Sequence, residues 1–146
     1  MPRRRCDSSQ QSAVRITGLK LVRTFQDLLV WNKAMDLVTE IYRLTKTFPK
    51  DELFGLTGQL RRAAISVPAN IAEGQGRLSE KEFRQFLGNA RGSLSEMETH
   101  ILIAHNLRYL DEESTRHLLD ASAEVGRILN GLLSKVVSAK KEKSRE

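Results

Sequence analysis

The sequence predicts an all-α protein, an up-down-up-down four-helix bundle formed by a single domain. Leu, Ala, Glu, Arg and Lys dominate the 146 residues, aromatic side chains make up 5 %, and there are three prolines, a composition typical of helices. Apolar residues recur at spacings of three and four in four segments joined by short turns, and short connections make consecutive helices antiparallel. We divide the chain into a disordered basic arm (1–24), the bundle (25–136) and a disordered basic tail (137–146).

The first helix is predicted from about Asp27 to Thr47. Its apolar stripe consists of Val30, Ala34, Leu37, Ile41 and Leu44. Pro49 ends this helix, because a proline disfavours helical backbone in the residue before it. The carboxylates of Asp51 and Glu52 are expected to open the second helix, since acidic groups suit a helix N-terminus.

The second helix carries Pro68 inside its periodic pattern. Its predicted apolar stripe is Leu53, Leu56, Leu60, Ala64, Val67 and Ile71. A proline there removes the N–H that would bond the carbonyl of Ala64, so we expect a kink near Ser66 to Pro68. Gly74 and Gly76 are predicted to end the helix in a left-handed cap.

The third helix is predicted to start at Ser79, which with Glu82 forms the S-x-x-E capping box. Its near-heptad apolar pattern extends to about Tyr109, and the fourth helix is predicted to run from Asp111 to about Val136. Gly88 and Gly92 lie inside the third helix, where each glycine costs roughly 1 kcal/mol relative to alanine. They predict a compensating close contact, either within the bundle or between subunits.

The net charge of +6 comes from the ends of the chain. Residues 1–24 hold six basic side chains against Asp7, whereas 25–134 are slightly acidic. The arm also has the Arg- and Ser-rich composition of a transit segment, although a disordered arm is the interpretation we prefer. A lone Cys6 excludes an internal disulfide and favours the cytoplasm, and no apolar run approaches the roughly 20 residues of a membrane span.

The spacing of the histidines does not predict a metal site. A di-iron bundle needs two Glu-x-x-His pairs, and the residues three before His100, His105 and His117 are not glutamates. No nucleophile paired with a base is recognisable either. The sequence therefore predicts a non-enzymatic protein without metal or cofactor.

Basic residues gather around the predicted corner between the second and third helices. The candidate nucleic-acid-binding residues are Arg61, Arg62, Arg77, Lys81, Arg84 and Arg91. The heptad spacing of Arg77, Arg84 and Arg91 would place them on one helix face if the third helix included Arg77. The alternative is that they form salt bridges, and the available partners are Glu52, Glu73, Glu80 and Glu82. No aromatic residue is interleaved with them, which favours contact with the nucleic-acid backbone without sequence readout over base stacking.

A series of short motifs in fixed order resembles a known bacterial family. The motifs are Leu29-Val30-Trp31, Phe48-Pro49, Glu52, Gly55-Leu56-Thr57, Gln59-Leu60-Arg61-Arg62-Ala63-Ala64, Ser66-Val67-Pro68, Asn70-Ile71-Ala72-Glu73-Gly74, Gly76-Arg77, Glu82-Phe83, Phe86-Leu87 and Ala90-Arg91-Gly92-Ser93-Leu94. From about Phe25 to Val136 the chain resembles the four-helix-bundle proteins associated with intervening sequences of 23S ribosomal RNA. These proteins include the accessory variability determinant of diversity-generating retroelements.

The resemblance implies a homopentameric ring of bundles with a basic surface, and no catalysis. For the retroelement member it implies binding of reverse transcriptase and nucleic acid. We therefore expect an oligomeric protein that binds RNA, DNA or an RNA–protein complex. The alternative is a protein-only adaptor that binds a partner such as a reverse transcriptase.

Overall fold

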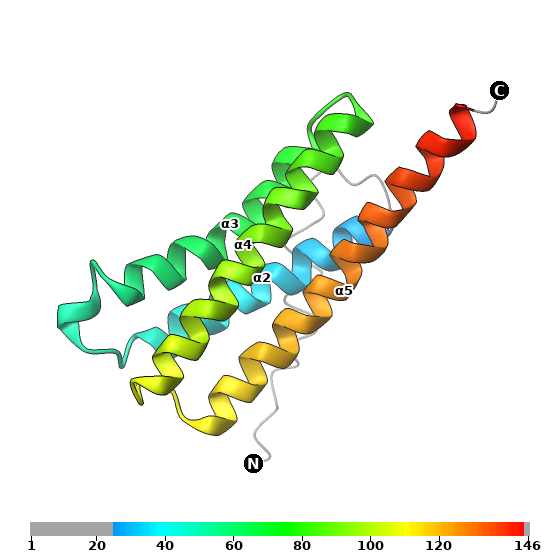
Figure 1. Ribbon diagram of the computed structural model, residues 1–146. Helices are drawn as coiled ribbons and strands as arrows, with labels where there is room; N and C mark the ends of the chain where they lie inside the picture. Colours follow the sequence, from blue (N-terminus) through cyan, green and yellow to red (C-terminus); the bar gives the residue numbers. More distant parts are fainter. Residues whose placement is uncertain (1–24, 145–146) are drawn as a thin grey trace, which may run out of the picture.

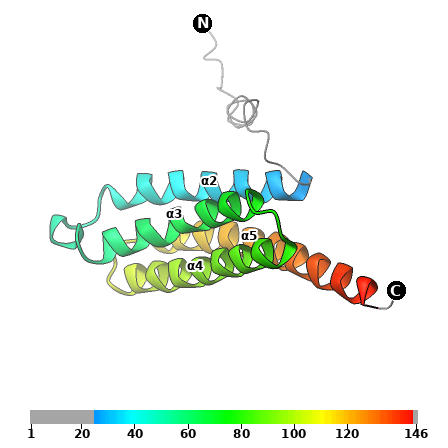
Figure 2. The same ribbon diagram turned by 90° about the horizontal axis from the view of Figure 1, so that it is seen from above.

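The computed structural model describes residues 25–144, which form four long α-helices and a single 3₁₀ turn. Their bounds are α2 Phe25–Thr45, η1 Lys50–Glu52, α3 Leu56–Gln75, α4 Glu80–Asn106 and α5 Glu112–Lys143. Each helix packs against the next one in the chain and α5 returns to α2, which closes a four-helix arrangement (Figures 1 and 2). The predicted all-α bundle is confirmed over this part of the chain, while the predicted arm at 1–24 lies outside it.

The core is formed by apolar side chains that all four helices direct inward. Its largest fully buried members are Val30, Ile41, Leu60, Val67, Ile71, Leu87, Leu94, Met97, Ile101, Leu118, Val125 and Leu129. Burying one such side chain contributes about 1.5–3 kcal/mol, so this cluster is the main source of stability. The C-terminal end of α5 extends past the ends of the other helices (Figure 1), and the helix continues beyond Val136, its predicted end.

The second helix begins later than the sequence predicted. Asp51 and Glu52 belong to the 3₁₀ turn η1, and α3 starts at Leu56. The Glu52 side chain still acts on the helix N-terminus, because its Oε2 accepts a hydrogen bond from the Leu56 backbone N–H at 2.9 Å. Leu53, which the sequence placed on the apolar stripe, is consequently outside the helix and 49 % exposed.

The end of α3 also differs from the prediction. Gly76 has φ −77°, so the expected left-handed cap is wrong. The last turn instead closes with right-handed backbone, since the N–H of Gly76 donates to the carbonyl of Ala72 at 3.2 Å. Pro68 does not interrupt the helix, which is continuous from Leu56 to Gln75, and the kink near Ser66 to Pro68 stays a prediction.

The third helix begins as predicted at the Ser79 cap. The Ser79 hydroxyl accepts the backbone N–H of Glu82 at 3.2 Å and lies 3.2 Å from that residue's carboxylate. The helix then runs for 27 residues, which corresponds to about 40 Å. It ends three residues before Tyr109 because Arg108 adopts a left-handed backbone conformation, φ 63°.

Asp111 caps the start of α5. Its carboxylate accepts the backbone N–H of Ser114 at 2.7 Å, and this hydrogen bond lowers the pKa of Asp111 below its usual value. A carboxyl with a lowered folded-state pKa stabilises the fold above the pKa of the unfolded chain, and the stabilisation is lost as the pH falls through the folded-state value.

We expect Asp111→Asn to make the protein less sensitive to acid. Asparagine caps helices about as well as aspartate but does not titrate. Wild type should therefore lose more unfolding free energy than the variant between neutral pH and about pH 3, as measured by urea unfolding at each pH. Equal losses in the two proteins would show that the Asp111 cap contributes nothing to acid stability.

Candidate nucleic-acid interface

The structure separates the six basic candidates into two groups. Arg61 and Arg62 lie in the second turn of α3, whereas the other four lie at the α3–α4 turn and in the first half of α4. The two helices are antiparallel and touch where Ser93 donates a hydrogen bond to Ser66 at 2.9 Å. At 1.5 Å per residue Arg62 lies roughly 20 Å along α3 from Arg77, but only about 9 Å from the level of Arg91. That the six residues form one nucleic-acid-binding surface stays a prediction.

Arg77 is engaged in structural contacts. It forms a salt bridge with Glu73 at 2.7 Å, and its guanidinium lies 4.9 Å from the centre of the Phe86 ring. Because α4 begins at Glu80, it does not include Arg77, so the condition for Arg77 to share a helix face with Arg84 and Arg91 is not met. The salt-bridge alternative considered for the arginines thus applies to this residue.

Arg61 joins two helices. Its Nε donates to the Thr45 hydroxyl at 2.9 Å, and its guanidinium lies 4.6 Å from the centre of the Tyr42 ring on α2. Thr45 is itself buried and bonds the carbonyl of Ile41. Arg62, one position further along α3, is exposed and forms no ion pair with any residue between 25 and 144. The neighbouring arginines consequently have different surroundings.

Lys81, Arg84 and Arg91 form no ion pair with any residue in the described part of the chain. The partners of Arg91 are neutral: its Nε donates to the Asn130 side chain at 3.0 Å and its Nη1 to the Ser95 hydroxyl at 3.2 Å. These bonds orient the guanidinium without neutralising it. In contrast, Arg43 on α2 is bonded to Glu40 and lowers the pKa of that carboxyl.

These three cations lie on the exposed side of α4, and the exposed Glu80 lies at its edge, one turn before Arg84. We define the α4 outer face as Lys81, Arg84, Gln85, Gly88, Arg91, Gly92, Ser95 and Thr99, which are exposed except for the half-buried Arg91. At 3.6 residues per turn the acids of α4 fall to either side of it. One of them, Glu98, accepts a hydrogen bond from Ser122 on α5.

Gly88 and Gly92 have no neighbour inside the described chain. A Cβ added at either position would meet no atom within 4 Å. A compensating contact inside the bundle is therefore not found for these two glycines, and a contact between subunits is the alternative that remains. Gly74, by contrast, is tightly packed between α3 and α4, since a Cβ there would lie 2.9 Å from the Cβ of Phe86.

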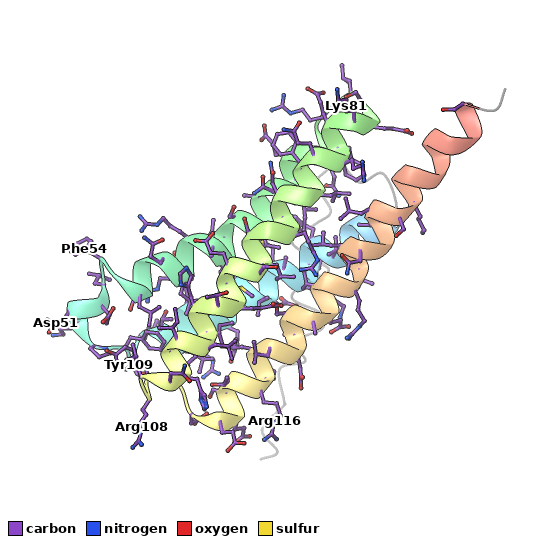
Figure 3. The ribbon with its side chains drawn as sticks, in the orientation of Figure 1. Asp51, Phe54, Lys81, Arg108, Tyr109 and Arg116 are labelled. Atoms are coloured by element: carbon purple, nitrogen blue, oxygen red, sulfur yellow. The ribbon has the colours of Figure 1, made fainter. Side chains whose placement is uncertain are left out.

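The sequence did not predict a second exposed feature, an apolar tip at the α2–α3 end of the bundle. The apolar tip consists of Leu53 and Phe54, which are adjacent in the chain. Phe54 is 94 % exposed and points away from the helices (Figure 3). The loop is held by Tyr109, which packs on Phe48 with ring centres 5.4 Å apart and lies 3.5 Å from Glu52. The sequence feature that could have indicated this tip is Phe54, an aromatic residue that does not fit the apolar stripe of α3.

Neither a metal site nor a membrane span is found in the described residues. No three His, Cys, Asp or Glu side chains lie close enough to hold an ion. Half-buried His100 lies 3.4 Å from Glu96, and His105 lies 3.2 Å from the hydroxyl of Thr115. None of the helices described combines the length and the hydropathy that crossing a bilayer requires.

Comparison with known families agrees with this architecture. Residues 26–131 match the family described as 23S rRNA-intervening sequence protein. The chain belongs to this family. The matched segment begins in α2 and ends in α5, so the 23S rRNA-intervening sequence family covers all four helices and both candidate surfaces.

A solved member of a related group has the same fold. It is a protein of unknown function from the S23 ribosomal protein family of Bacteroides thetaiotaomicron, with a TM-score of 0.71 and 22 % identity. The match covers 75 % of this chain and 99 % of that one. No curated protein matches the sequence. At this identity the structural likeness shows the fold of the chain and nothing about its function.

Proposed function

We propose that the protein is a non-enzymatic, self-associating helical bundle of the cytoplasm that binds nucleic acid through the α4 outer face, largely without sequence readout. The observation that carries the proposal is that Lys81, Arg84 and Arg91 share this face without an ion pair to any residue from 25 to 144. Cations that no carboxylate neutralises attract phosphates and release counterions on binding. Arg62 contributes from a separate position, and Arg61 and Arg77 support the fold.

The proposed lack of sequence readout has a structural reason. The aromatic rings nearest to the α4 outer face are unavailable for base stacking, since Phe83 is buried and Phe86 packs under Arg77. Phosphate contacts position a protein on nucleic acid but do not distinguish one base from another. Affinity should therefore depend on salt much more than on sequence.

Self-association is proposed through the outer side of α3. Ile65 is 43 % exposed there, and Ala69 and Ala72 lie one and two turns further along the same side. Small side chains next to an exposed Ile let a second helix approach closely. A pentameric ring, as the family resemblance implies, would place one basic α4 face on every subunit, and binding of one nucleic acid by several faces at once would raise the overall affinity.

The proposal is tested by binding of the full-length protein to a labelled structured RNA and a random-sequence duplex DNA across a salt series, with light scattering to measure the oligomer. Dissociation constants of about 1–100 µM near physiological salt and a log-linear loss of affinity with salt are expected. Absence of binding by an intact oligomer, or binding that salt does not weaken, would contradict it.

The apolar tip favours a second function, that of a protein adaptor for a partner such as a reverse transcriptase. Phe54 is a large aromatic side chain that is 94 % exposed on a loop fixed by Glu52 and Tyr109. Exposed aromatic anchors of this kind dominate many protein interfaces.

We expect Phe54→Ser to change the unfolding free energy by less than about 0.5 kcal/mol, because the side chain contacts little of the fold. If the tip docks a reverse transcriptase, the same substitution should weaken that complex by about tenfold or more, as measured by calorimetry with the purified polymerase. Ala123→Ser, on the exposed side of α5, is the control. Unchanged affinity in the Phe54 variant would exclude the tip as the docking site.

A further inference from the structure

The bundle can be divided into two halves along its length. Because consecutive helices are antiparallel, one end holds the start of α2, the α3–α4 turn and the end of α5, and the other end holds the α2–α3 and α4–α5 connections (Figure 1). Division at the helix midpoints gives a proximal half, the one nearer Phe25, and a distal half. Of residues 25–135, the proximal half comprises 25–35, 66–93 and 127–135, and the distal half comprises 36–65 and 94–126.

The two halves differ in the sign of their net charge. The proximal half holds seven basic side chains and four acidic ones, whereas the distal half holds seven basic and eleven acidic ones. Both tails add to the proximal excess, because 1–24 joins the bundle at Phe25 and 137–146 follows the second half of α5. The first tail holds six basic residues against Asp7, and the second holds four against two. The positive charge of the chain is thus attached to one end of a bundle whose other end is acidic.

The charges of each half are accessible to a ligand. Of the eleven carboxylates in the distal half, eight are exposed, and the other three are hydrogen-bonded within the bundle. In the proximal half the exposed cations are Lys81, Arg84, Arg127 and Lys135. A phosphate group therefore meets mainly cations at the proximal half and mainly carboxylates at the distal half.

The halves are far enough apart to act on a ligand separately. α3 alone has 20 residues, which corresponds to about 30 Å, whereas salt screens exposed charges beyond about 8 Å at physiological ionic strength. A nucleic acid lying along the whole bundle would face the excess carboxylates of the distal half. One that is held at the proximal half avoids this repulsion.

The position of the tails adds to the preference for the proximal half. A binding segment tethered close to a second one acts at a raised effective concentration, and both tails leave the bundle in the half that contains Lys81, Arg84 and Arg91. Each further cation that contacts a phosphate also releases a counterion. The tails and the α4 outer face together can therefore bind one nucleic acid more tightly than any of them alone.

We infer that the nucleic acid is held at the proximal half, by the α4 outer face and both tails together, with the distal half directed away from it. This inference rests on the proposed nucleic-acid function and makes it more specific. The apolar tip belongs to the distal half, so a protein partner can bind there while nucleic acid is bound.

The first test compares two positions for a photo-crosslinking group on the full-length protein. With Cys6→Ser as background, Leu78→Cys attaches the group in the proximal half and Phe54→Cys attaches it in the distal half. The two positions are matched, because Leu78 is 102 % and Phe54 94 % exposed. The ligand is a random-sequence DNA duplex of about 10 base pairs, roughly 34 Å long, which could reach both positions if it lay along the bundle. We expect about tenfold more crosslinking from position 78.

The second test removes one carboxylate from each half. Glu80 and Glu113 are both exposed and lie in the first turns of α4 and α5, so both substitutions have a similar effect on their helix. Glu80→Gln should raise the affinity for the duplex by about two- to fivefold at low salt, because the carboxylate lies beside the bound phosphates. Glu113→Gln makes the same change of net charge and should leave the affinity unchanged.

The third test concerns the N-terminal tail. The triple substitution Arg3→Gln, Arg4→Gln and Arg5→Gln in the full-length protein should weaken binding by about tenfold and lower the slope of log affinity against log salt by up to about three. Light scattering and circular dichroism check that the oligomer and the fold are retained. Unchanged affinity would show that the tail does not contact the ligand and would overturn its part in the inference.

The outcomes separate the inference from the function beneath it. Equal crosslinking from positions 54 and 78, or an equal gain in affinity from Glu80→Gln and Glu113→Gln, would overturn the proximal location while the binding itself still supports the nucleic-acid function. Absence of binding to the duplex and to a structured RNA would overturn the proposed function.

Discussion

Reversing the charges of Arg84 and Arg91 together, as Arg84→Glu and Arg91→Glu, is expected to weaken nucleic-acid binding by about a hundredfold at low salt. Each substitution removes one phosphate contact and puts a carboxylate in its place, and the slope of log affinity against log salt should fall by about two. Arg84 is exposed without an ion pair to any residue of the described bundle, and Arg91 bonds only neutral partners. The fold should therefore lose no more than about 1 kcal/mol.

The control for this experiment carries the same change of net charge elsewhere. Lys50→Glu with Arg116→Glu alters exposed side chains at the opposite end of the bundle from Lys81 (Figure 3). Its basic tails are identical to those of wild type, so any contribution of 1–24 and 137–146 remains. If both double variants lose affinity equally, net charge and the tails account for binding and the α4 outer face is not the site.

The helices could be predicted because their signals are local. The spacing of apolar residues and the Ser79–Glu82 box depend only on residues a few positions apart, and the structure reproduces both. The predicted start of α3 was wrong for the same reason, namely that the prediction used local signals alone. An acidic pair suits the first turn of an α-helix and a 3₁₀ turn equally well, and the contact of Tyr109 with Glu52, 57 positions away, is invisible in a local pattern.

The candidate site was harder to predict because its members depend on packing between helices. Arg61 and Arg62 are adjacent in sequence, yet successive residues on a helix point about 100° apart, so the first meets α2 and the second meets solvent. Arg77 shares the heptad spacing of Arg84 but precedes the helix. The sequence shows that Gly88 and Gly92 are unusual inside a helix. The side of the bundle that they face depends on how all four helices are arranged.

Gly74 is a position where a single methyl group should destabilise the contact between two helices. A Cβ there would lie 2.9 Å from the Cβ of Phe86 and 3.2 Å from the ring of buried Phe83. The first of these atoms cannot rotate away, because a Cβ is fixed to its backbone, so α3 and α4 must move apart. We expect Gly74→Ala to lower the unfolding free energy by about 1–3 kcal/mol, measured by urea unfolding, despite the better helix propensity of alanine.

Gly88→Ala is the matched comparison, since it makes the same chemical change on the same pair of helices. Its Cβ meets no atom within 4 Å, so only propensity acts and the unfolding free energy should rise by about 1 kcal/mol. A gain at both positions would show that α3 and α4 are not in close contact at Gly74. If Gly88→Ala instead weakens the oligomer, in light scattering at several protein concentrations, α4 packs against a neighbouring subunit, and the cations beside Gly88 face that subunit instead of a nucleic acid.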